Sequence, residues 1–237
     1  MDNEKVGILR RAYRKMLYRD LDNVYKHHFN LPQKPKNNRI FLDVGTGFGF
    51  EHIRAVREGF RTFGLEYDKE RVKKTAQKFR ENGFAITLVV GDAQNLPYKK
   101  NVFDVISCKH VIEHIPQDRK CLNDMFLLLK KTGQLNLAVP NRHNLRTKWR
   151  TKLKMKNPYT DSTHLREYSK EEVLDLLKES NFEVKSVEMR GFTPPVGLKA
   201  QMILGHYLPT GKMLDKIGEF LPQYATEVSI VAEKVQN

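Results

Sequence analysis

The sequence predicts an α/β domain in which helices cover both faces of a doubly wound, mostly parallel sheet. Short apolar runs alternate along the chain with longer segments of helical periodicity, as in repeated strand–helix units. The apolar run at residues 40–44 passes directly into Gly45, Gly47 and Gly49, and a helix opens at Phe50. In doubly wound sheets such a corner binds nucleotides, because glycine lets the backbone turn tightly and approach a ligand.

The composition is that of a globular protein with a basic surface. Of the 237 residues, 40% are hydrophobic and 30% charged, which suits one well-buried domain with additions. No apolar run reaches the roughly 20 residues that cross a bilayer, and the first residues lack the apolar core of a secretory signal. Cys108 and Cys121 have no metal-type spacing, so we expect reduced thiols and a cytoplasmic protein. The net charge of +14 indicates nucleic acid, an anionic membrane or a phosphorylated substrate as a partner, or simply a lysine-rich solvated surface.

The chain divides into an N-terminal helical extension with a linker, residues 1–36, and a main domain, residues 37–237. A helix expected over residues 4–29 carries an apolar stripe and a basic flank, which suit a lid or, alternatively, a membrane-surface helix that gathers substrate. The expected strands cover residues 40–44, 63–65, 84–90, 102–108, 134–139, 182–189 and 227–234. The expected helices begin at residue 50 and cover residues 69–82, 118–130 and 170–180, with a turn at residues 132–133 before the fifth strand.

The glycine loop has the spacing D-x-G-x-G-x-G rather than the G-x-G-x-x-G of dinucleotide sites. This pattern resembles the first motif of the class I S-adenosylmethionine (SAM) methyltransferases. The resemblance implies a Rossmann-like, seven-stranded sheet whose last strand is antiparallel, and SAM as the cofactor. It implies that Asp43 faces the ammonium group of SAM, and that free N–H groups in the loop of Gly45, Thr46 and Gly47 face its carboxylate.

Three later positions are candidates for the rest of the cofactor. Glu66 ends the second strand, where an acid can accept hydrogen bonds from both ribose hydroxyls, and Tyr67 beside it is a candidate contact to the adenine face. Asp68 more plausibly caps the following helix. Asp92 and Ala93 follow the third strand and match the family position that holds the adenine, although an ordinary turn acid explains Asp92 as well.

A second centre follows the fourth strand, at the edge of the sheet where ligands bind. The string F-D-V-I-S…V-I-E-H-I-P looks like the small-molecule branch of the family, which includes ubiquinone-biosynthesis O-methyltransferases. Lys109, which directly follows the fourth strand, joins the candidate cofactor-binding residues. His110, Glu113 and His114 fall at i, i+3 and i+4, so on one helical turn they would share a face.

Three interpretations of this histidine group stay open. The side chains can line the methyl-transfer pocket with one imidazole as general base, hold a divalent metal that activates a hydroxyl, or cap and pack a helix start. In ubiquinone-type enzymes a Glu-x-x-Glu-His string has the metal role, but here His110 replaces the first Glu, which makes the ligand set softer. The sequence favours the first interpretation, and no metal is assigned.

A third string, T-H-L-R-E-Y-S-x-E-E-V, again looks like the small-molecule branch. In such relatives the histidine before the helix points toward the acceptor, so His164 is a further candidate catalytic group, with Arg166 and Tyr168 beside it. A histidine that only stabilises a turn is the alternative. Ser169 and Glu172 form a predicted capping box for the helix that follows.

Two further segments have open roles. A basic stretch over residues 142–156 contains the only tryptophan, Trp149, and suits a funnel for an anionic substrate, a contact to phosphate backbone or membrane, or a solvated loop. No nucleic-acid-binding module accompanies it. An insertion over residues 191–226 contains apolar side chains that can wall an acceptor pocket, touch lipid or pack on the sheet.

Taken together, these features predict a SAM-dependent methyltransferase that methylates an oxygen or nitrogen of a small, lipid-like or anionic acceptor. The alternatives are an RNA or protein methyltransferase that uses the basic surface, a non-catalytic SAM-binding regulator, and, more distantly, a NAD-binding oxidoreductase. No N-P-P-Y string follows the fourth strand, which counts against N-methylation of nucleobases. Contact with an anionic membrane surface is a further expectation, and nucleic acid is the less favoured partner.

Overall fold

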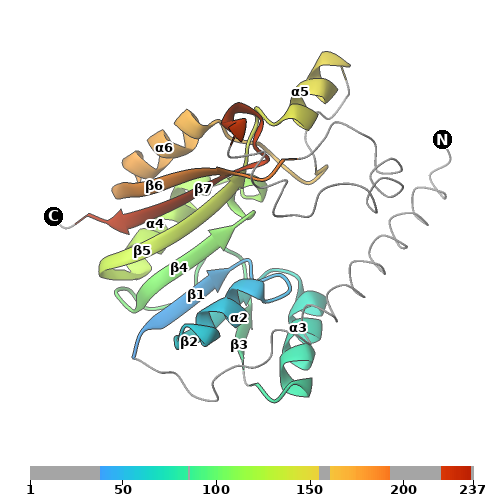
Figure 1. Cartoon of the computed structure of the whole chain (residues 1–237). Helices are drawn as coiled ribbons and strands as arrows, with labels where there is room; N and C mark the ends of the chain where they lie inside the picture. Colours follow the sequence, from blue (N-terminus) through green and yellow to red (C-terminus); the bar gives the residue numbers. More distant parts are fainter. Residues whose placement is uncertain (1–37, 85, 155–160, 193–219, 236–237) are drawn as a thin grey trace, which may run out of the picture.

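Seven strands form one sheet in the order β3-β2-β1-β4-β5-β7-β6 (Figure 1). The structure, a computed structural model, describes residues 38–84, 86–154, 161–192 and 220–235, so the helix expected over residues 4–29 and most of the insertion lie outside it. The strands are β1 (Ile40–Val44), β2 (Arg61–Glu66), β3 (Thr87–Val90), β4 (Phe103–Lys109), β5 (Leu129–Pro140), β6 (Phe182–Arg190) and β7 (Glu227–Lys234). β1 to β5 pair in parallel, and β7 runs antiparallel between β5 and β6. The predicted Rossmann-like sheet with an antiparallel last strand is therefore confirmed.

Two strand boundaries differ from the prediction. β3 begins at Thr87 rather than at residue 84, because Phe84 instead packs against the cluster of Ile53 and Phe79. β5 begins at Leu129, so residues 132–133 do not form a turn between a helix and a strand. They lie in an irregular part of the ladder between β4 and β5, where the register shifts and the local backbone bends.

Helices lie on both faces of the sheet: α2 (Phe50–Arg57), α3 (Lys69–Glu81), α4 (Asp118–Leu128) and α6 (Lys170–Glu179). Alternation along β1 separates the two layers, because successive side chains of a strand point to opposite faces. Phe41 packs with Ala55 of α2, whereas Leu42 belongs to the large core that includes Met125 of α4 and Leu177 of α6. In Figure 1, α2 and α3 lie by the β1–β3 half of the sheet and α6 by β6.

Helix ends follow the predicted chemistry. The Asp68 carboxylate accepts hydrogen bonds from the first turn of α3, and Ser169 and Glu172 form the reciprocal capping box of α6. A short helix that the sequence did not predict, α5 (Leu145–Lys152), is capped by Asn144, whose side chain accepts from the Thr147 N–H. No helix among the described residues is both long and apolar enough to cross a membrane.

The sheet has its switch point between β1 and β4, which are neighbours in register, with Val44 opposite Cys108. From β1 the chain turns through α2 toward β2, and from β4 it turns through α4 toward β5. The two connections therefore leave opposite sides of the β1–β4 pair, and in open α/β sheets ligands bind outside the carboxyl ends of the strands at such a point.

Candidate functional site

The glycine loop after β1 has the backbone conformation that the sequence predicts. Gly45, Gly47 and Gly49 have φ angles of 74°, 54° and 80°, in the left-handed region that glycine adopts without strain. A Cβ on Gly45 would collide with Cγ2 of Val111, whereas a Cβ on Gly47 would meet only the Gly45 carbonyl oxygen at 3.8 Å. The loop is thus tight at Gly45 and open above Gly47.

One expectation about this loop is wrong. The N–H groups of Gly45 and Thr46 both donate to the Leu65 carbonyl oxygen, at 2.8 and 3.1 Å, and the Gly47 N–H donates to Oε2 of Glu66 at 2.9 Å. The end of β2 therefore uses the N–H groups that were expected to be free for a ligand. The buried Thr46 hydroxyl donates inward, to the carbonyl oxygen of Asp43.

Glu66 lies at the end of β2, as predicted, and joins two segments of the site. Its Oε2 holds Gly47, and its Oε1 accepts from the Asp68 N–H at 3.0 Å and lies 3.6 Å from the Arg71 guanidinium. A carboxylate offers about four lone-pair positions, so these contacts leave capacity for further donors. Tyr67, next to it, is 78% exposed and accessible to a planar ligand.

Asp43 is buried beneath the loop, and its partner is a histidine that the sequence reasoning missed. Its Oδ2 lies 3.3 Å from Nδ1 of His52, a buried residue of α2. Burial raises the pKa of Asp43, and the contact with His52 only partly opposes that rise. Because burial disfavours the charged form of this carboxyl group, Asp43 suits a site in which a cation binds beside it.

The remaining candidate cofactor residues lie at the same edge. Asp92 accepts hydrogen bonds from the N–H and the side chain of Gln94, so its carboxylate also stabilises a turn, and Ala93 beside it is buried. Lys109 ends β4 and forms a 2.8 Å ion pair with Glu51 of α2. That pair ties the end of β4 to the helix that follows the glycine loop.

His110, Glu113 and His114 do not share one helical turn, contrary to the prediction. Only a short 3-10 helix, η1 (Ile112–His114), forms here, and His110 precedes it with a φ of 54°, which turns the chain before the helix begins. The His110 ring instead lies between two carboxylates, with Nε2 2.8 Å from Glu227 and Nδ1 3.5 Å from Glu113.

This position makes His110 a poor general base. Partial burial lowers its pKa, but the contacts with Glu113 and Glu227 outweigh this effect and raise the pKa to about 9. The imidazole is therefore protonated at neutral pH and cannot take up a further proton. Glu227 belongs to β7, and nothing in the sequence indicated that it would reach this position.

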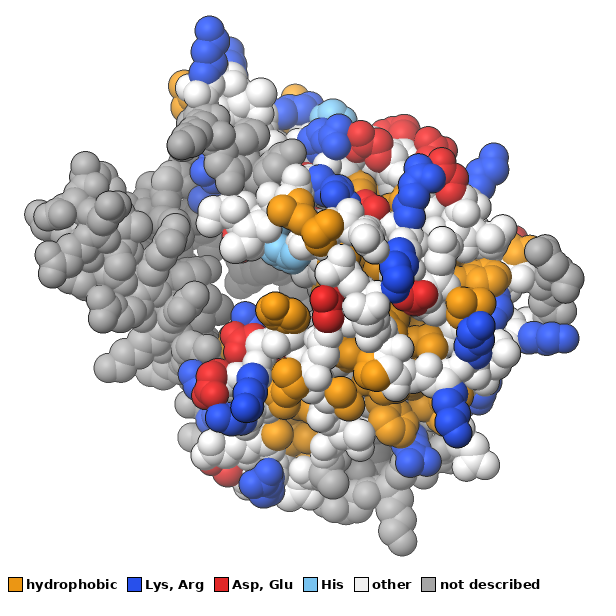
Figure 2. Space-filling view, turned by 180° about the vertical axis from the view of Figure 1, so that it is seen from behind, with side chains coloured by type: hydrophobic (Ala, Val, Ile, Leu, Met, Phe, Trp, Pro, Cys, Tyr) orange, Lys and Arg blue, Asp and Glu red, His pale blue; other side chains and the backbone are white. Residues whose placement is uncertain are grey.

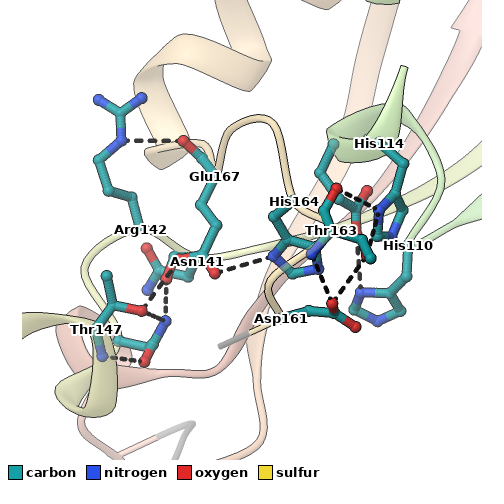
Figure 3. Close-up of polar contacts among 11 residues, drawn as sticks. His110, His114, Asn141, Arg142, Thr147, Asp161, Thr163, His164 and Glu167 are labelled. Atoms are coloured by element: carbon teal, nitrogen blue, oxygen red, sulfur yellow. Dashed lines mark hydrogen bonds and ion pairs between the residues drawn. The ribbon is translucent and has the colours of Figure 1, made fainter. Parts of the chain in front are cut away.

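His164 replaces His110 in the group that the structure does bring together. The carbonyl oxygen of Glu113 accepts from the Leu165 N–H at 2.9 Å, which fixes the segment around His164 against η1. The rings of His114 and His164 are 4.8 Å apart, and one ligand atom from each of Glu113, His114 and His164 lies within 4.8 Å of the others (Figure 3).

Each of these two histidines is oriented through Nδ1. His164 Nδ1 lies 3.1 Å from Oε1 of the buried Glu167, whose Oε2 accepts from the Thr147 hydroxyl at 3.1 Å. His114 Nδ1 lies 3.2 Å from the Thr163 carbonyl oxygen. Glu167 follows His164 by three residues within the string T-H-L-R-E-Y-S, and this spacing is the sequence signal that could have identified Glu167 as its partner.

Arg166 and Tyr168 do not join His164 in the site. The Arg166 guanidinium and the Tyr168 hydroxyl both reach Asp118 at the start of α4, at 2.6 and 2.8 Å. They fix this connection to α4 instead of facing an acceptor.

Comparison with known proteins identifies the family. The family described as "Methyltransferase domain" matches residues 35–185, more than half of the chain. Norajmaline N-methyltransferase of Rauvolfia serpentina is 32% identical over 39% of this chain and 32% of that protein. Ubiquinone biosynthesis O-methyltransferase of Vibrio cholerae is 26% identical over 46% of each. The chain thus spans less than half the length of these two relatives.

A solved structure agrees in fold. Phosphoethanolamine N-methyltransferase 2 of Haemonchus contortus, in complex with phosphomonomethylethanolamine and S-adenosylhomocysteine, superposes with a TM-score of 0.60 at 17% identity, over 92% of this chain and 53% of that one. Residues 35–185, which match the methyltransferase-domain family, include the glycine loop, Glu66, Asp92 and both His114 and His164. From the fold, the site and this match, we conclude that the chain belongs to the methyltransferase-domain family of class I SAM-dependent methyltransferases.

Proposed function

We propose that this chain transfers the methyl group of SAM to an oxygen or nitrogen of a small acceptor that is lipid-like or anionic. The observation that carries the proposal is the placement of two centres at one edge of the sheet. The glycine loop follows β1, and Glu66 ends β2. On the other side of the switch point, Glu113 and His114 follow β4, and His164, between α5 and α6, joins them.

The first centre fits SAM by its shape and its charges. The loop is open above Gly47, Glu66 presents a carboxylate at the end of β2, and Asp43 holds a buried negative charge below. These groups suit ribose hydroxyls and an ammonium group, with Tyr67, Asp92 and Ala93 toward the adenine. When bound, SAM supplies a methyl group already activated on a sulfonium.

The second centre suits the acceptor. Transfer forms a bond from the acceptor atom to the methyl carbon and breaks the carbon–sulfur bond, which leaves S-adenosylhomocysteine and a proton from the acceptor. Because His164 directs Nδ1 at Glu167, its Nε2 is the basic atom, and the same holds for His114. We assign the deprotonation of the acceptor to this cluster.

A basic helix supports an anionic acceptor or membrane contact. α5 follows β5 and contains Arg146, Lys148, Arg150 and Lys152 and no acid, while Trp149 is 51% and Leu153 is 64% exposed. Positive charge with exposed apolar side chains suits an anionic headgroup. On the face that Figure 2 shows, the Lys and Arg side chains of the described residues are scattered among acids and apolar groups.

The proposal is tested by incubating the purified chain with methyl-tritiated SAM and a cell extract, then fractionating the products. We expect label in the organic-phase or small aqueous fraction. Label confined to a nuclease-sensitive or protein fraction would overturn the acceptor class. SAM binding without transfer to any fraction of extracts from several sources would favour the non-catalytic regulator.

A further inference from the structure

Glu113 is a buried carboxylate without a matching donor. Its side chain is fully buried, and neither oxygen has a hydrogen-bond partner among the residues that the structure describes. The nearest cation is His110, whose Nδ1 lies 3.5 Å from Oε1, beyond normal hydrogen-bond length. A buried ionised carboxylate without donors is costly, so such a group indicates a ligand that supplies positive charge.

Two imidazole rings lie beside this carboxylate, each in the tautomer whose Nε2 can bind a cation. Thr163 Oγ1 donates to Asp161 at 2.8 Å, and its carbonyl can only accept, so both atoms act as acceptors for the Nδ1–H of His114. The Glu167 carboxylate likewise holds the proton on Nδ1 of His164. The Nε2 atoms of both rings therefore keep a free lone pair, as in metal-binding histidines that are oriented by a carboxylate or a carbonyl.

The surrounding charge also favours a cation, although the chain as a whole is strongly basic. Besides Glu113, the carboxylates of Asp161 and Glu167 lie against the two histidines. His110 is the opposing cation, and it is neutralised by its 2.8 Å contact with Glu227. Acidic groups thus surround His114 and His164, and Asp161 and Glu167 are drawn beside them in Figure 3.

We propose that Glu113, His114 and His164 bind one divalent transition-metal ion. Two imidazoles and one carboxylate form the ligand set of many catalytic zinc sites and of open iron sites, and it favours Zn²⁺, Co²⁺ or Mn²⁺ over Mg²⁺. Bonds of about 2.1 Å place ligand atoms roughly 3.4 Å apart in a tetrahedral site. One candidate ligand atom of each residue lies within 4.8 Å of the others, so small side-chain movements would bring the three residues to this spacing on loading.

This inference deepens the proposed function and rests on it only for the ion's chemical role. Three protein ligands leave a coordination position open for an acceptor oxygen. An ion held by Glu113, His114 and His164 would make an acceptor hydroxyl more acidic, so that its proton could pass to water before methyl transfer. With the ion bound, Nε2 of His164 is a ligand rather than the atom that takes up the proton.

The test is a titration of the full chain, freed of metal by a chelator, with Co²⁺ and Zn²⁺. We expect one Co²⁺ per chain, with visible absorption bands that Zn²⁺ abolishes. The variants His114→Gln and His164→Gln should each bind at least about tenfold more weakly, and Glu167→Gln, which changes only a positioning residue, should bind about 10- to 100-fold more weakly. His143→Gln, an exposed histidine that follows β5, is the matched control and should bind as wild type.

Two outcomes would overturn the inference: no stoichiometric uptake of either ion by the wild type, or unchanged affinity in both histidine variants. Circular dichroism of each variant verifies folding, and His114→Gln, at an exposed side chain, keeps the test decisive if Glu167→Gln, at a buried one, fails to fold. SAM affinity is measured on the same samples. If the wild type takes up no ion but binds SAM and transfers the methyl group, only the metal site is refuted, whereas absence of SAM binding by the wild type refutes the proposed function.

Discussion

The N–H of Gly47 donates a 2.9 Å hydrogen bond to Oε2 of Glu66, and this bond joins the glycine loop after β1 to the end of β2. The same carboxylate accepts from the Asp68 N–H, so one buried side chain holds two backbone segments together around the predicted ribose position. A ligand hydroxyl that reaches Glu66 therefore meets an acceptor that is already fixed in place, which lowers the entropic cost of binding.

The first prediction concerns this carboxylate. Glu66→Gln replaces one acceptor oxygen with an NH₂ donor that faces backbone N–H groups. We expect SAM affinity to fall by about 10- to 100-fold, since hydrogen bonds to a charged group contribute about 1.5–3 kcal/mol. Isothermal titration measures the change, and Glu70→Gln, an exposed acid paired with Lys73 on the next helix, serves as control. Equal affinity in the two variants would remove Glu66 from the cofactor site.

The second prediction separates backbone strain from close approach. Gly45 and Gly83 have similar φ angles, 74° and 79°, but only at Gly45 would a Cβ collide with a neighbour, Val111. Gly83→Ala should lower the free energy of unfolding by about 1–2 kcal/mol through the left-handed conformation alone. Gly45→Ala should cost a further ~1–3 kcal/mol for overpacking. Urea denaturation of both variants checks this, and equal losses would contradict the contact with Val111.

The third prediction is a dependence of stability on pH. Because burial raises the pKa of Asp43 above its unfolded value of 3.8, the folded state binds this proton more tightly than the unfolded state does. The contribution is stabilising below the unfolded pKa and is lost as pH rises through the folded pKa. Asp43→Asn removes the titration, so the melting temperature of the variant minus that of wild type should increase between pH 4 and pH 7.

Thermal unfolding without SAM, followed by circular dichroism, measures this difference. A difference that stays constant over the range, or that shrinks as pH rises, would show that Asp43 is not costly when ionised. The same variant should bind SAM more weakly, because it lacks the negative charge for the ammonium group. Higher stability with weaker binding is the signature expected of a functional carboxylate.

The fourth prediction concerns Tyr67, which is 78% exposed. Tyr67→Ala should leave stability within about 0.5 kcal/mol of wild type, because the side chain packs against little of the protein. It should weaken SAM binding about two- to tenfold through lost aromatic contact, worth about 0.5–1.5 kcal/mol. Tyr67→Phe keeps the ring and should bind as wild type. If both variants bind equally, the ring has no role in adenine binding.

Much of the fold could be predicted from local sequence. Strand patterning, the glycine spacing and capping residues such as Asp68 and Ser169 act over a few residues, and the structure confirms each of them. Glu66 could be located because an acid at the end of the second strand follows from chain order alone. Local sequence did not show that the end of β2 would accept hydrogen bonds from the N–H groups of the glycine loop, because these bonds depend on how β1 and β2 lie side by side.

The acceptor side was harder to predict, since its contacts are long-range. His164 reaches Glu113 and His114 across about 50 positions of sequence, through backbone hydrogen bonds to η1. Glu227 reaches His110 only because β7 inserts beside β5. The helical spacing of His110 and His114 misled the prediction, because the left-handed turn at His110 prevents a regular helix there.

Equilibrium dialysis of the purified chain against tritiated SAM tests the central claim most directly, with S-adenosylhomocysteine, NADH and ATP as competitors. The account predicts one saturable site per chain that S-adenosylhomocysteine competes for and that NADH and ATP do not affect. Displacement by NADH, or no saturable binding of SAM by the folded protein, would contradict the assignment of the glycine loop, Asp43 and Glu66 to a SAM site.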